Sequence, residues 1–267
     1  MKTVPTSYKR NIFKTTLQKT FGVLGYTISQ KDIKQNPQHL NQVTAKDFFD
    51  LYFSLIDPQN FFFIQFGAND GSFVDPMYDY VKHYNLTGVL VEPQKDVFNK
   101  LKTNYKNQNN VTFANIAISN TDGEKILYTI SDDLKNKDDL FNRMTGIASF
   151  DRDLLLKSLQ YEFLKKSWHA QMKEADRYIV ETKVTTLTFK SFIKKYGIKQ
   201  IDYIQMDCEG YDYEIIKMID LGSRFPKIIN FESTHLSDAD RKECEEMLAA
   251  NGYRTFRHRF DTCAYRI

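Results

Sequence analysis

The sequence has little cysteine, no long apolar run and no strong excess of charge of one sign. Its three cysteines, Cys208, Cys244 and Cys263, are far apart and include no Cys-x-x-Cys pair, which excludes a disulfide framework and a cysteine zinc site. No stretch approaches the roughly 18 apolar residues that a transmembrane helix requires, and the polar first residues do not resemble a signal peptide. We therefore expect a soluble, cytoplasmic protein in a reducing compartment.

The net charge is only +3, and the sequence has no long basic run. Nucleic-acid binding is therefore not expected, because it needs a concentrated positive surface. With 11 glycines, 6 prolines and 42% hydrophobic residues among 267, the chain is neither collagen-like nor disordered, and it can bury a sizeable core. The composition is that of a globular protein, and it does not indicate an oligomeric state.

The pattern divides the chain into an N-terminal helical extension, residues 1–57, and an α/β domain, residues 58–267. In the extension, Thr44 and Asp47 have the spacing of a capping box, and Asp57-Pro58 ends the helical pattern. Within the domain, residues 131–177 form a polar insertion with one long helix. We expect this insertion to cover the substrate, with the loop 144–150 as a contact.

After residue 60, short apolar runs alternate with helical segments. Strands are predicted at 61–66, 87–92, 111–119, 178–186, 201–207 and 227–232, with 124–130 as a hairpin partner and a last antiparallel hairpin near the C-terminus. Strands that are separated by helices pair in parallel through right-handed crossovers. The sequence therefore predicts a doubly wound α/β sheet, with the ligand at the carboxyl ends of its strands.

Two glycines and one acid predict a site for an adenosine-containing cofactor. Gly67 and Gly71 bracket the turn after the first strand, where glycine allows the backbone to approach a ligand closely. Glu92 ends the next strand, where an acid can accept hydrogen bonds from both ribose hydroxyls. The turn lacks the middle glycine of G-x-G-x-x-G, and its acid favours the cationic S-adenosylmethionine (SAM) over a pyrophosphate. Turn glycines beside a solvated acid are the alternative interpretation.

Five segments together resemble the FkbM-type SAM-dependent methyltransferases. They are FIQFGANDG (63–71), VLVEP (89–93), AIS (117–119), IDYIQMDCEGYDYEIIKMI (201–219) and KIINFES (227–233). The resemblance implies a seven-stranded, mainly parallel class I methyltransferase fold in which the last hairpin supplies the antiparallel edge.

By the same resemblance, the loop after the first strand holds the methionine part of SAM, Glu92 holds the ribose, and residues near Ala117 flank the adenine. Gln65 stands where many class I methyltransferases have an acid, so Asn69 or Asp70 would have to help hold the SAM amino group. The implied cofactor-binding residues are Gln65, Gly67, Ala68, Asn69, Asp70, Gly71, Glu92, Pro93, Ala117 and Asp207.

Methyl transfer to an alcohol requires alignment of the two substrates and removal of the hydroxyl proton. Asp207 and Glu232, at the ends of neighbouring strands, and the nearby His235 are the predicted catalytic residues. His235 is the leading candidate for the base, because the ordinary pKa of histidine is near neutral pH. An ordinary loop histidine is the alternative interpretation.

A second hypothesis gives the carboxylates a metal. Asp207, Glu209 and Glu232 have the oxygen ligands that Mg²⁺ or Ca²⁺ prefers, and such an ion would polarise the acceptor hydroxyl. Glu209 has a simpler alternative role, since an acid also stabilises the start of the helix that follows.

The sequence therefore predicts a SAM-dependent O-methyltransferase that acts on a small-molecule or glycan hydroxyl, with a sugar of a glycan or glycolipid as first choice. Two other functions remain open at this point. One is a nicotinamide-dependent oxidoreductase, which shares the strand–turn–helix and the ribose acid. The other is a SAM-binding module without turnover.

Overall fold

The computed structural model describes residues 45–72, 75–135, 146–222, 226–258 and 260–266. The chain forms two compact units, residues 1–49 and 50–267. The described part of the first unit is the beginning of helix α3 (Ala45–Leu55), so the predicted helices before it and Thr44 of the predicted capping box lie outside the described residues. Within the described residues, no helix is long and apolar enough to cross a membrane.

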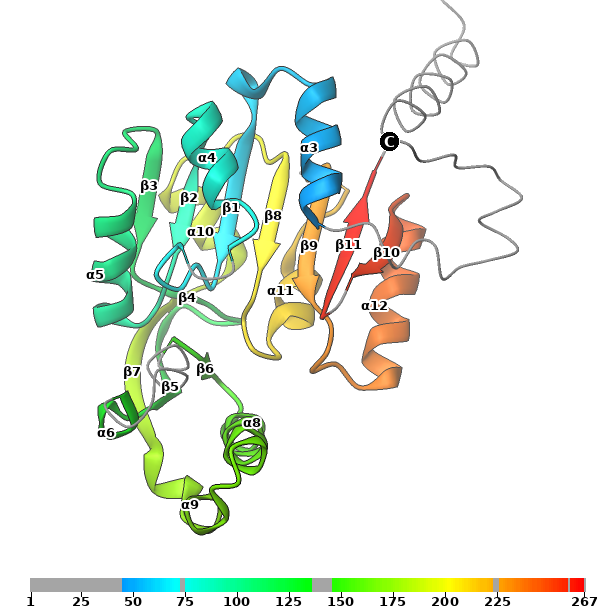
Figure 1. The fold of residues 1–267 in the computed structure, drawn as a ribbon. Coiled ribbons are helices and arrows are strands. Elements are labelled where there is room, and N and C mark those ends of the chain that lie inside the picture. Colours follow the sequence, from blue (N-terminus) through cyan, green and yellow to red (C-terminus); the bar gives the residue numbers. More distant parts are fainter. Residues whose placement is uncertain (1–44, 73–74, 136–145, 223–225, 259, 267) are drawn as a thin grey trace, which may run out of the picture. The chain divides into compact units, whose positions relative to one another are not determined.

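The second unit is built on a seven-stranded sheet, which confirms the predicted doubly wound fold (Figure 1). Strands β9 (Ile228–Glu232), β8 (Tyr203–Met206), β1 (Phe62–Phe66), β2 (Thr87–Val91) and β3 (Val111–Ala114) are neighbours in this order and all parallel. Strand β11 (Asp261–Tyr265) pairs antiparallel with β9 and with the edge strand β10 (Arg254–His258). The parallel strands are short and largely buried, as their apolar sequences predict.

Helices connect the strands and cover the sheet. Helices α10 (Phe189–Lys195), α11 (Asp212–Met218) and α12 (Asp238–Ala250) share one apolar core with the sheet, in which Phe192, Ile216 and Leu248 are completely buried. Helix α4 (Tyr78–Tyr84) lies on the opposite side, and α5 (Lys95–Asn104) flanks β3 (Figure 1). The short helices η2 (Pro58–Asn60) and η3 (Ala175–Tyr178) complete the connections.

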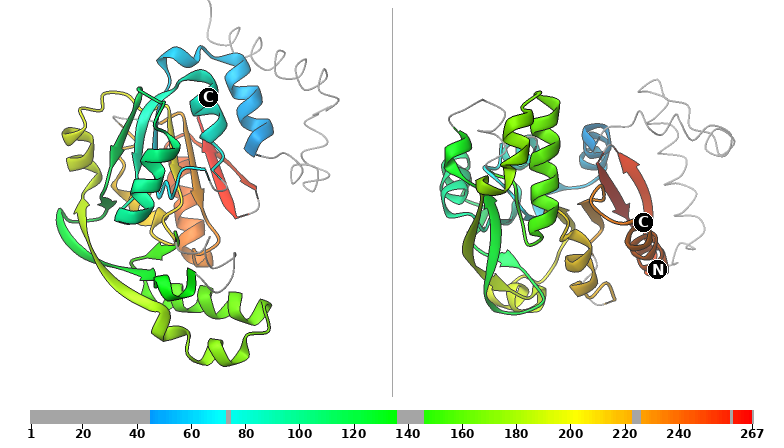
Figure 2. Two further views of the ribbon diagram at one scale, coloured as in Figure 1. Left: turned by 60° about the vertical axis from the view of Figure 1, so that its left-hand side comes forward. Right: turned by 90° about the horizontal axis from the view of Figure 1, so that it is seen from below.

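A second, four-stranded sheet lies beyond the carboxyl ends of the parallel strands (Figures 1 and 2). Its order is β4 (Ala117–Ile118), β7 (Ile179–Leu187), β5 (Gly123–Ile130) and β6 (Ala148–Ser149). Two predictions are therefore wrong: the strand predicted at 111–119 is interrupted after Ala114, and the strand predicted at 178–186 pairs antiparallel with β5 instead of joining the main sheet. From Glu181 to Thr186 of β7, exposed residues alternate with less exposed ones, which suits a sheet with one solvated face.

The predicted insertion, 131–177, lies inside this second sheet and adds helices α6 (Asp132–Lys135), α8 (Arg152–Lys165) and α9 (His169–Lys173). The apolar side of α8 packs Leu159 and Phe163 into a small core of its own. Trp168 stacks on Phe163 with ring centroids 6.1 Å apart, so it extends this core. Leu164, on the same helix, is half exposed.

Candidate functional site

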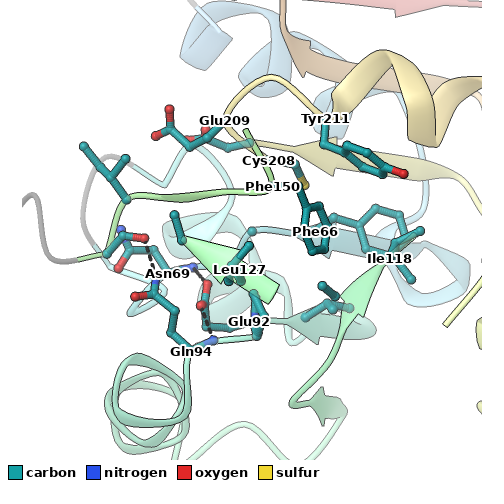
Figure 3. A pocket seen from close by; sticks show the side chains of 18 of the residues that line it. Phe66, Asn69, Glu92, Gln94, Ile118, Leu127, Phe150, Cys208, Glu209 and Tyr211 are labelled. Carbon is teal, nitrogen blue, oxygen red and sulfur yellow. Dashed lines mark hydrogen bonds between the residues drawn. The ribbon is translucent and has the colours of Figure 1, made fainter. Parts of the chain in front are cut away.

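A pocket lies at the carboxyl ends of the parallel strands, where the fold predicts a ligand (Figure 3). Its space is about 660 Å³, including open solvent at the mouth. The residues that line it are Phe66, Gly67, Asn69, Val91, Glu92, Pro93, Gln94, Ile116, Ala117, Ile118, Leu127, Gly146, Ile147, Ala148, Phe150, Asp207, Cys208, Glu209 and Tyr211.

Gly67 brings the loop after β1 against the loop after β8. Its φ is +71°, and a Cβ there would be 1.9 Å from the carbonyl oxygen of Asp207. The Asp207 N–H donates to the Phe66 carbonyl at 3.1 Å, which fixes the two loops together. No residue other than glycine fits this close approach. The predicted role of Gly67 in shaping the site therefore has a specific steric basis.

The carboxylate of Glu92 is buried at the pocket wall, with 2% of the residue exposed. Its Oε2 accepts from the Asn69 N–H at 3.0 Å, and its Oε1 accepts from the Gln94 N–H at 2.8 Å (Figure 3). Burial raises the pKa of this carboxyl to about 7. Each oxygen has capacity to accept a further hydrogen bond, so the group can still bind a diol.

The second sheet supplies one wall of the pocket. The Gln94 side chain donates from Nε2 to the Gly146 carbonyl at 2.7 Å, and a Cβ on Gly146 would be 2.3 Å from Nδ2 of Asn69. Gly146, Ile147, Ala148 and Phe150 of the predicted substrate loop thus line the same pocket as Glu92, while 144 and 145 lie outside the described residues. The sequence analysis did not identify Gln94, and a single polar residue after Glu92-Pro93 is a weak signal.

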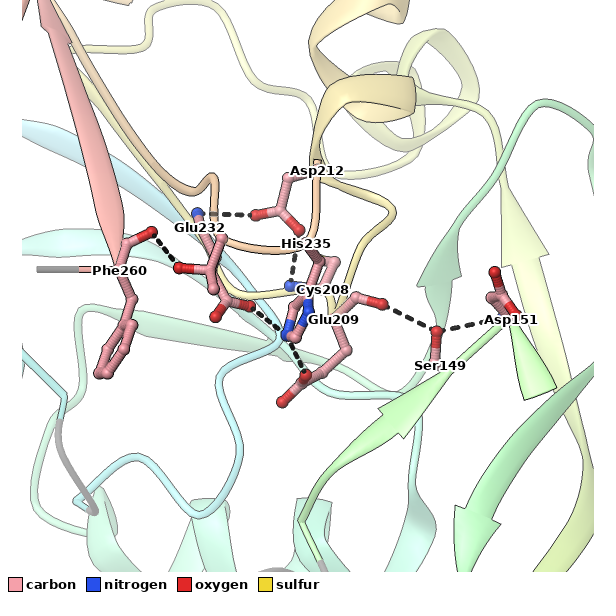
Figure 4. A network of polar contacts seen from close by, with 9 residues as sticks. Ser149, Asp151, Cys208, Glu209, Asp212, Glu232, His235 and Phe260 are labelled. Atoms are coloured by element: carbon pink, nitrogen blue, oxygen red, sulfur yellow. Dashed lines mark hydrogen bonds and ion pairs between the residues drawn. The ribbon is translucent and has the colours of Figure 1, made fainter. Parts of the chain in front are cut away.

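Beyond the pocket, acidic side chains gather around one histidine (Figure 4). Nε2 of His235 lies 3.3 Å from Oε2 of Glu209 and 3.5 Å from Oε2 of Glu232. Glu209 lines the pocket, whereas Glu232 and His235 do not. Glu209 and Gly210 both have left-handed backbones, with φ of +47° and +93°, which turn the chain sharply at this point. Glu209 therefore connects the pocket to the group around His235.

The protonation states here differ from those expected from the sequence. The hydrogen bond to Glu209 raises the pKa of His235 to about 9, so the imidazole holds its proton at neutral pH and is not a free base in this state. Burial, together with the charges of Glu209 and Asp207, raises the pKa of Glu232 to about 8. Asp207 is exposed and lines the pocket, yet the surrounding protein and the nearby carboxylates raise its pKa well above the ordinary range.

Asp212, at the start of α11, is a buried residue that connects two backbone segments of this region by hydrogen bonds. It is completely buried, and its carboxylate accepts from the Cys208 N–H at 3.1 Å and from the Glu232 N–H at 3.2 Å (Figure 4). Burial is the main reason that its pKa is raised to about 8. The sequence analysis did not single it out, although an acid in the first turn of the helix after the Asp207–Gly210 segment was visible.

A metal-binding geometry is present, but with different members from those predicted. Within the described ranges, Glu209, Glu232 and His235 each offer a ligand atom, and these atoms lie within 4.8 Å of one another. Asp207 is not a member of that group. The His235 imidazolium already places a positive charge between the two carboxylates, which lowers the electrostatic need for a second cation.

Four predicted cofactor residues do not line the pocket: Gln65, Ala68, Asp70 and Gly71. Gln65 is buried beside Asp75, whose pKa burial raises to about 6, and a Cβ on Gly71 would meet Leu101 of α5 at 2.4 Å. Asp70 accepts from the N–H and Oγ of Ser72, which stabilises its own turn. Of the two residues expected to help Gln65, only Asn69 reaches the pocket.

The family described as "Methyltransferase FkbM domain" matches residues 65–255. No curated protein matches the chain. Among solved structures, the N-terminal domain of human METTL16 is 11% identical, with a TM-score of 0.40 over 90% of this chain and 71% of that one. The precorrin-6y C5,15-methyltransferase from Geobacter metallireducens is 9% identical, with a TM-score of 0.38 over 78% and 81%. These likenesses are too distant for any inference about substrate.

Proposed function

Because the chain belongs to the FkbM methyltransferase family and is therefore a SAM-dependent methyltransferase, we propose that it methylates a hydroxyl oxygen, most suitably of a sugar in a glycan, glycolipid or glycosylated metabolite. One observation supports the proposal above the others. Glu209 lines the pocket, contacts His235 and belongs to the same cluster as Glu232. The pocket that we assign to the methyl donor therefore adjoins groups that can accept a proton.

The residues of the pocket fit SAM. Glu92 has two oxygens with unused acceptor capacity for the ribose diol, and Gly67 leaves room that a Cβ would close. Ile116, Ala117 and Ile118 offer an apolar wall for the adenine. The acidic end formed by Asp207 and Glu209 favours a positively charged ligand, and a pyrophosphate would be repelled there. This charge distribution disfavours the nicotinamide alternative.

Bound SAM supplies an electrophilic methyl group at a sulfonium. The protein's own part is then to align the acceptor and to take its hydroxyl proton. Oε2 of Glu232 is buried and faces Nε2 of His235 at 3.5 Å. We assign the hydroxyl proton to the carboxylate of Glu232, because a pKa of about 8 suits a general base near neutral pH. The adjacent imidazolium of His235 stabilises the carboxylate before the proton arrives.

Asp207 and Glu209 act from the pocket side in this proposal. Their carboxylates lie at the end of the pocket that adjoins His235, so they stabilise positive charge next to the transfer site. A divalent cation is a second candidate for the space between Glu209, Glu232 and His235, on the strength of their 4.8 Å separation. The cation and the imidazolium exclude each other, since a bound metal requires the neutral imidazole.

We also place the enzyme in a reducing compartment such as the cytoplasm, because Cys208, Cys244 and Cys263 are free thiols.

The experiment that tests the function as a whole has two parts. Calorimetry measures the binding of SAM and, separately, of NAD, and an assay measures the release of S-adenosylhomocysteine (SAH). Methyl glycosides are the acceptors. We expect SAM binding and SAH release that depends on the glycoside. SAM binding without SAH release from any hydroxylated compound would instead indicate a binding module.

A further inference from the structure

Phe260 is exposed in the turn between β10 and β11. Of the large apolar side chains in the described part of the chain, it has the largest exposed fraction, 65%. Leaving a phenyl ring in water forgoes the favourable free energy of burying it. A single exposed apolar residue is common on protein surfaces, so its position has to decide whether it has a role.

The turn between β10 and β11 does not require a phenylalanine. His258 of β10 pairs with Asp261 of β11, so residues 259 and 260 alone connect the two strands. Two-residue hairpin loops favour glycine, asparagine and aspartate, because these residues adopt the required backbone at low cost. Phe260 does not have the left-handed backbone for which such loops prefer these residues, so the turn neither requires nor excludes its side chain.

The backbone of Phe260 is fixed to the segment that carries the proposed base. Its carbonyl accepts from the Ser233 N–H at 2.9 Å and from Oγ1 of Thr234 at 3.1 Å. The next residue, Asp261, pairs with Glu232 in the sheet. In the view of Figure 4, Phe260 and Ser149 lie on opposite sides of Glu232. The exposed ring of Phe260 therefore extends from a backbone that is fixed beside the end of β9, where Glu232 would receive the acceptor's proton.

We infer that the face of Phe260 binds the ring of the acceptor molecule while the reacting hydroxyl lies at Glu232 and His235. The ligand class is a saturated ring with an apolar C–H face and hydroxyl groups at its edge, as in a pyranose. Such a ring stacks on an aromatic face, and its hydroxyls point to the polar cluster beside it. This inference rests on the proposed function and adds to it a residue that selects the acceptor.

The test measures methyl transfer from SAM to methyl glycosides and to an open-chain sugar alcohol. In Phe260→Leu we expect KM for the glycosides to rise about 3- to 10-fold, the range that corresponds to the loss of one aromatic contact, with kcat within twofold. Phe260→Trp keeps the wild-type KM or lowers it. The matched control is Tyr161→Leu, because Tyr161 is a 58% exposed aromatic on α8 outside the pocket lining and the His235 cluster.

The outcomes separate this inference from the proposed function. Wild-type turnover tests the function; saturation-transfer NMR of a methyl glycoside with the SAH complex tests the ring contact without turnover. An unchanged KM and an unchanged NMR signal in Phe260→Leu would overturn the inference, as would an equal rise in KM for the sugar alcohol. If Phe260→Leu instead abolished self-association in sedimentation experiments, the ring's partner would be a second copy of the chain.

Discussion

Asp212 holds the backbone of Glu232: its Oδ1 accepts from the Glu232 N–H at 3.2 Å, while its Oδ2 accepts from the Cys208 N–H at 3.1 Å. One buried carboxylate therefore links the end of β9 to the loop after β8. The loop from Asp207 to Gly210 lines the donor pocket, and Glu232 belongs to the cluster around His235. Together with the pairing of β8 and β9, this side chain therefore fixes Glu232 relative to the pocket.

The first prediction concerns that link. Asp212→Ala leaves two backbone N–H groups without their acceptor, and each buried, unsatisfied group costs about 1–3 kcal/mol. We expect the free energy of unfolding to fall by about 2–4 kcal/mol, measured by urea denaturation. Asp238→Ala is the control, since the Asp238 side chain is 98% exposed and should change stability by less than about 0.5 kcal/mol. Equal effects in the two variants would contradict the structural role of Asp212.

The second prediction is a pH dependence of SAM binding. Burial raises the pKa of Glu92 to about 7, so the carboxyl is mostly protonated at pH 6 and mostly ionised at pH 8. The ribose diol donates to the ionised form, so affinity for SAM should increase as the pH rises through 7, by up to about tenfold. Calorimetry at several pH values measures the Kd for SAM.

Glu92→Gln is the control for this pH dependence. The amide keeps the shape of the side chain but does not titrate. We expect it to weaken SAM binding by at least about tenfold, as the loss of hydrogen bonds to a charged group implies. We also expect the affinity of this variant to be flat between pH 6 and 8. Wild-type binding that was flat over the same range would show that Glu92 does not hold the diol.

The third prediction concerns the close approach at Gly67. In Gly67→Ala the new methyl group would meet the Asp207 carbonyl oxygen at 1.9 Å, in addition to the strain of a φ of +71°. Gly197→Ala is a matched control, because Gly197 has a φ of +62° and nothing within 4 Å of the new Cβ. We expect Gly197→Ala to cost about 1–2 kcal/mol of stability and Gly67→Ala clearly more, with loss of SAM binding. Thermal denaturation and calorimetry compare the two.

The fourth prediction tests the base. Glu232→Gln should lower kcat by about 10²- to 10⁴-fold and leave the Kd for SAM within about threefold. In the wild type, kcat should rise with pH through about 8 as Glu232 ionises, and fall above about 9 as His235 loses its proton. The fall at high pH should disappear in His235→Ala. A Glu232→Gln variant with wild-type kcat would remove Glu232 from the mechanism.

The fifth prediction separates the imidazolium from a metal ion. Because His235 holds a proton between Glu209 and Glu232, we expect full activity after dialysis against a chelator. Added Mg²⁺ or Ca²⁺ should change kcat less than twofold. If activity disappeared with the chelator and returned with one of these ions, the cation would take the place that we assign to the imidazolium.

The main sheet was predictable because its strands are continuous apolar runs between turn signals. FFIQF and TGVLV of β1 and β2 are such runs, and the Ser237–Asp240 pair marks the start of α12, where Ser237 Oγ accepts from the Asp240 N–H at 3.1 Å. The second sheet was harder, because periodicity shows that β7 is a strand but does not show which strand it pairs with. Gly123–Ile130 pairs with it, and the paired residues are 49 to 63 positions apart in the chain.

The candidate site shows the same division. Gly67 and Glu92 were predictable because each directly follows a strand, and the fold brings such positions together. The positive charge of His235 was not predictable, because it depends on Glu209 and Glu232, which come from different loops and lie 3.3 Å and 3.5 Å from its Nε2. The role of Gln65 stays a prediction: its position matches a family motif, and its side chain is buried beside Asp75 and does not line the pocket.

The contact between Gln94 and Gly146 has a practical consequence for anyone who trims this enzyme. Leu127, Gly146, Ile147, Ala148 and Phe150, from the second sheet and the segment next to it, complete a pocket whose other walls come from the main sheet. A shortened version without that segment would retain Glu92 and Gly67 but expose the donor to bulk water along one side. Engineering of minimal or chimeric versions should therefore treat residues 146–150 as belonging to the donor site.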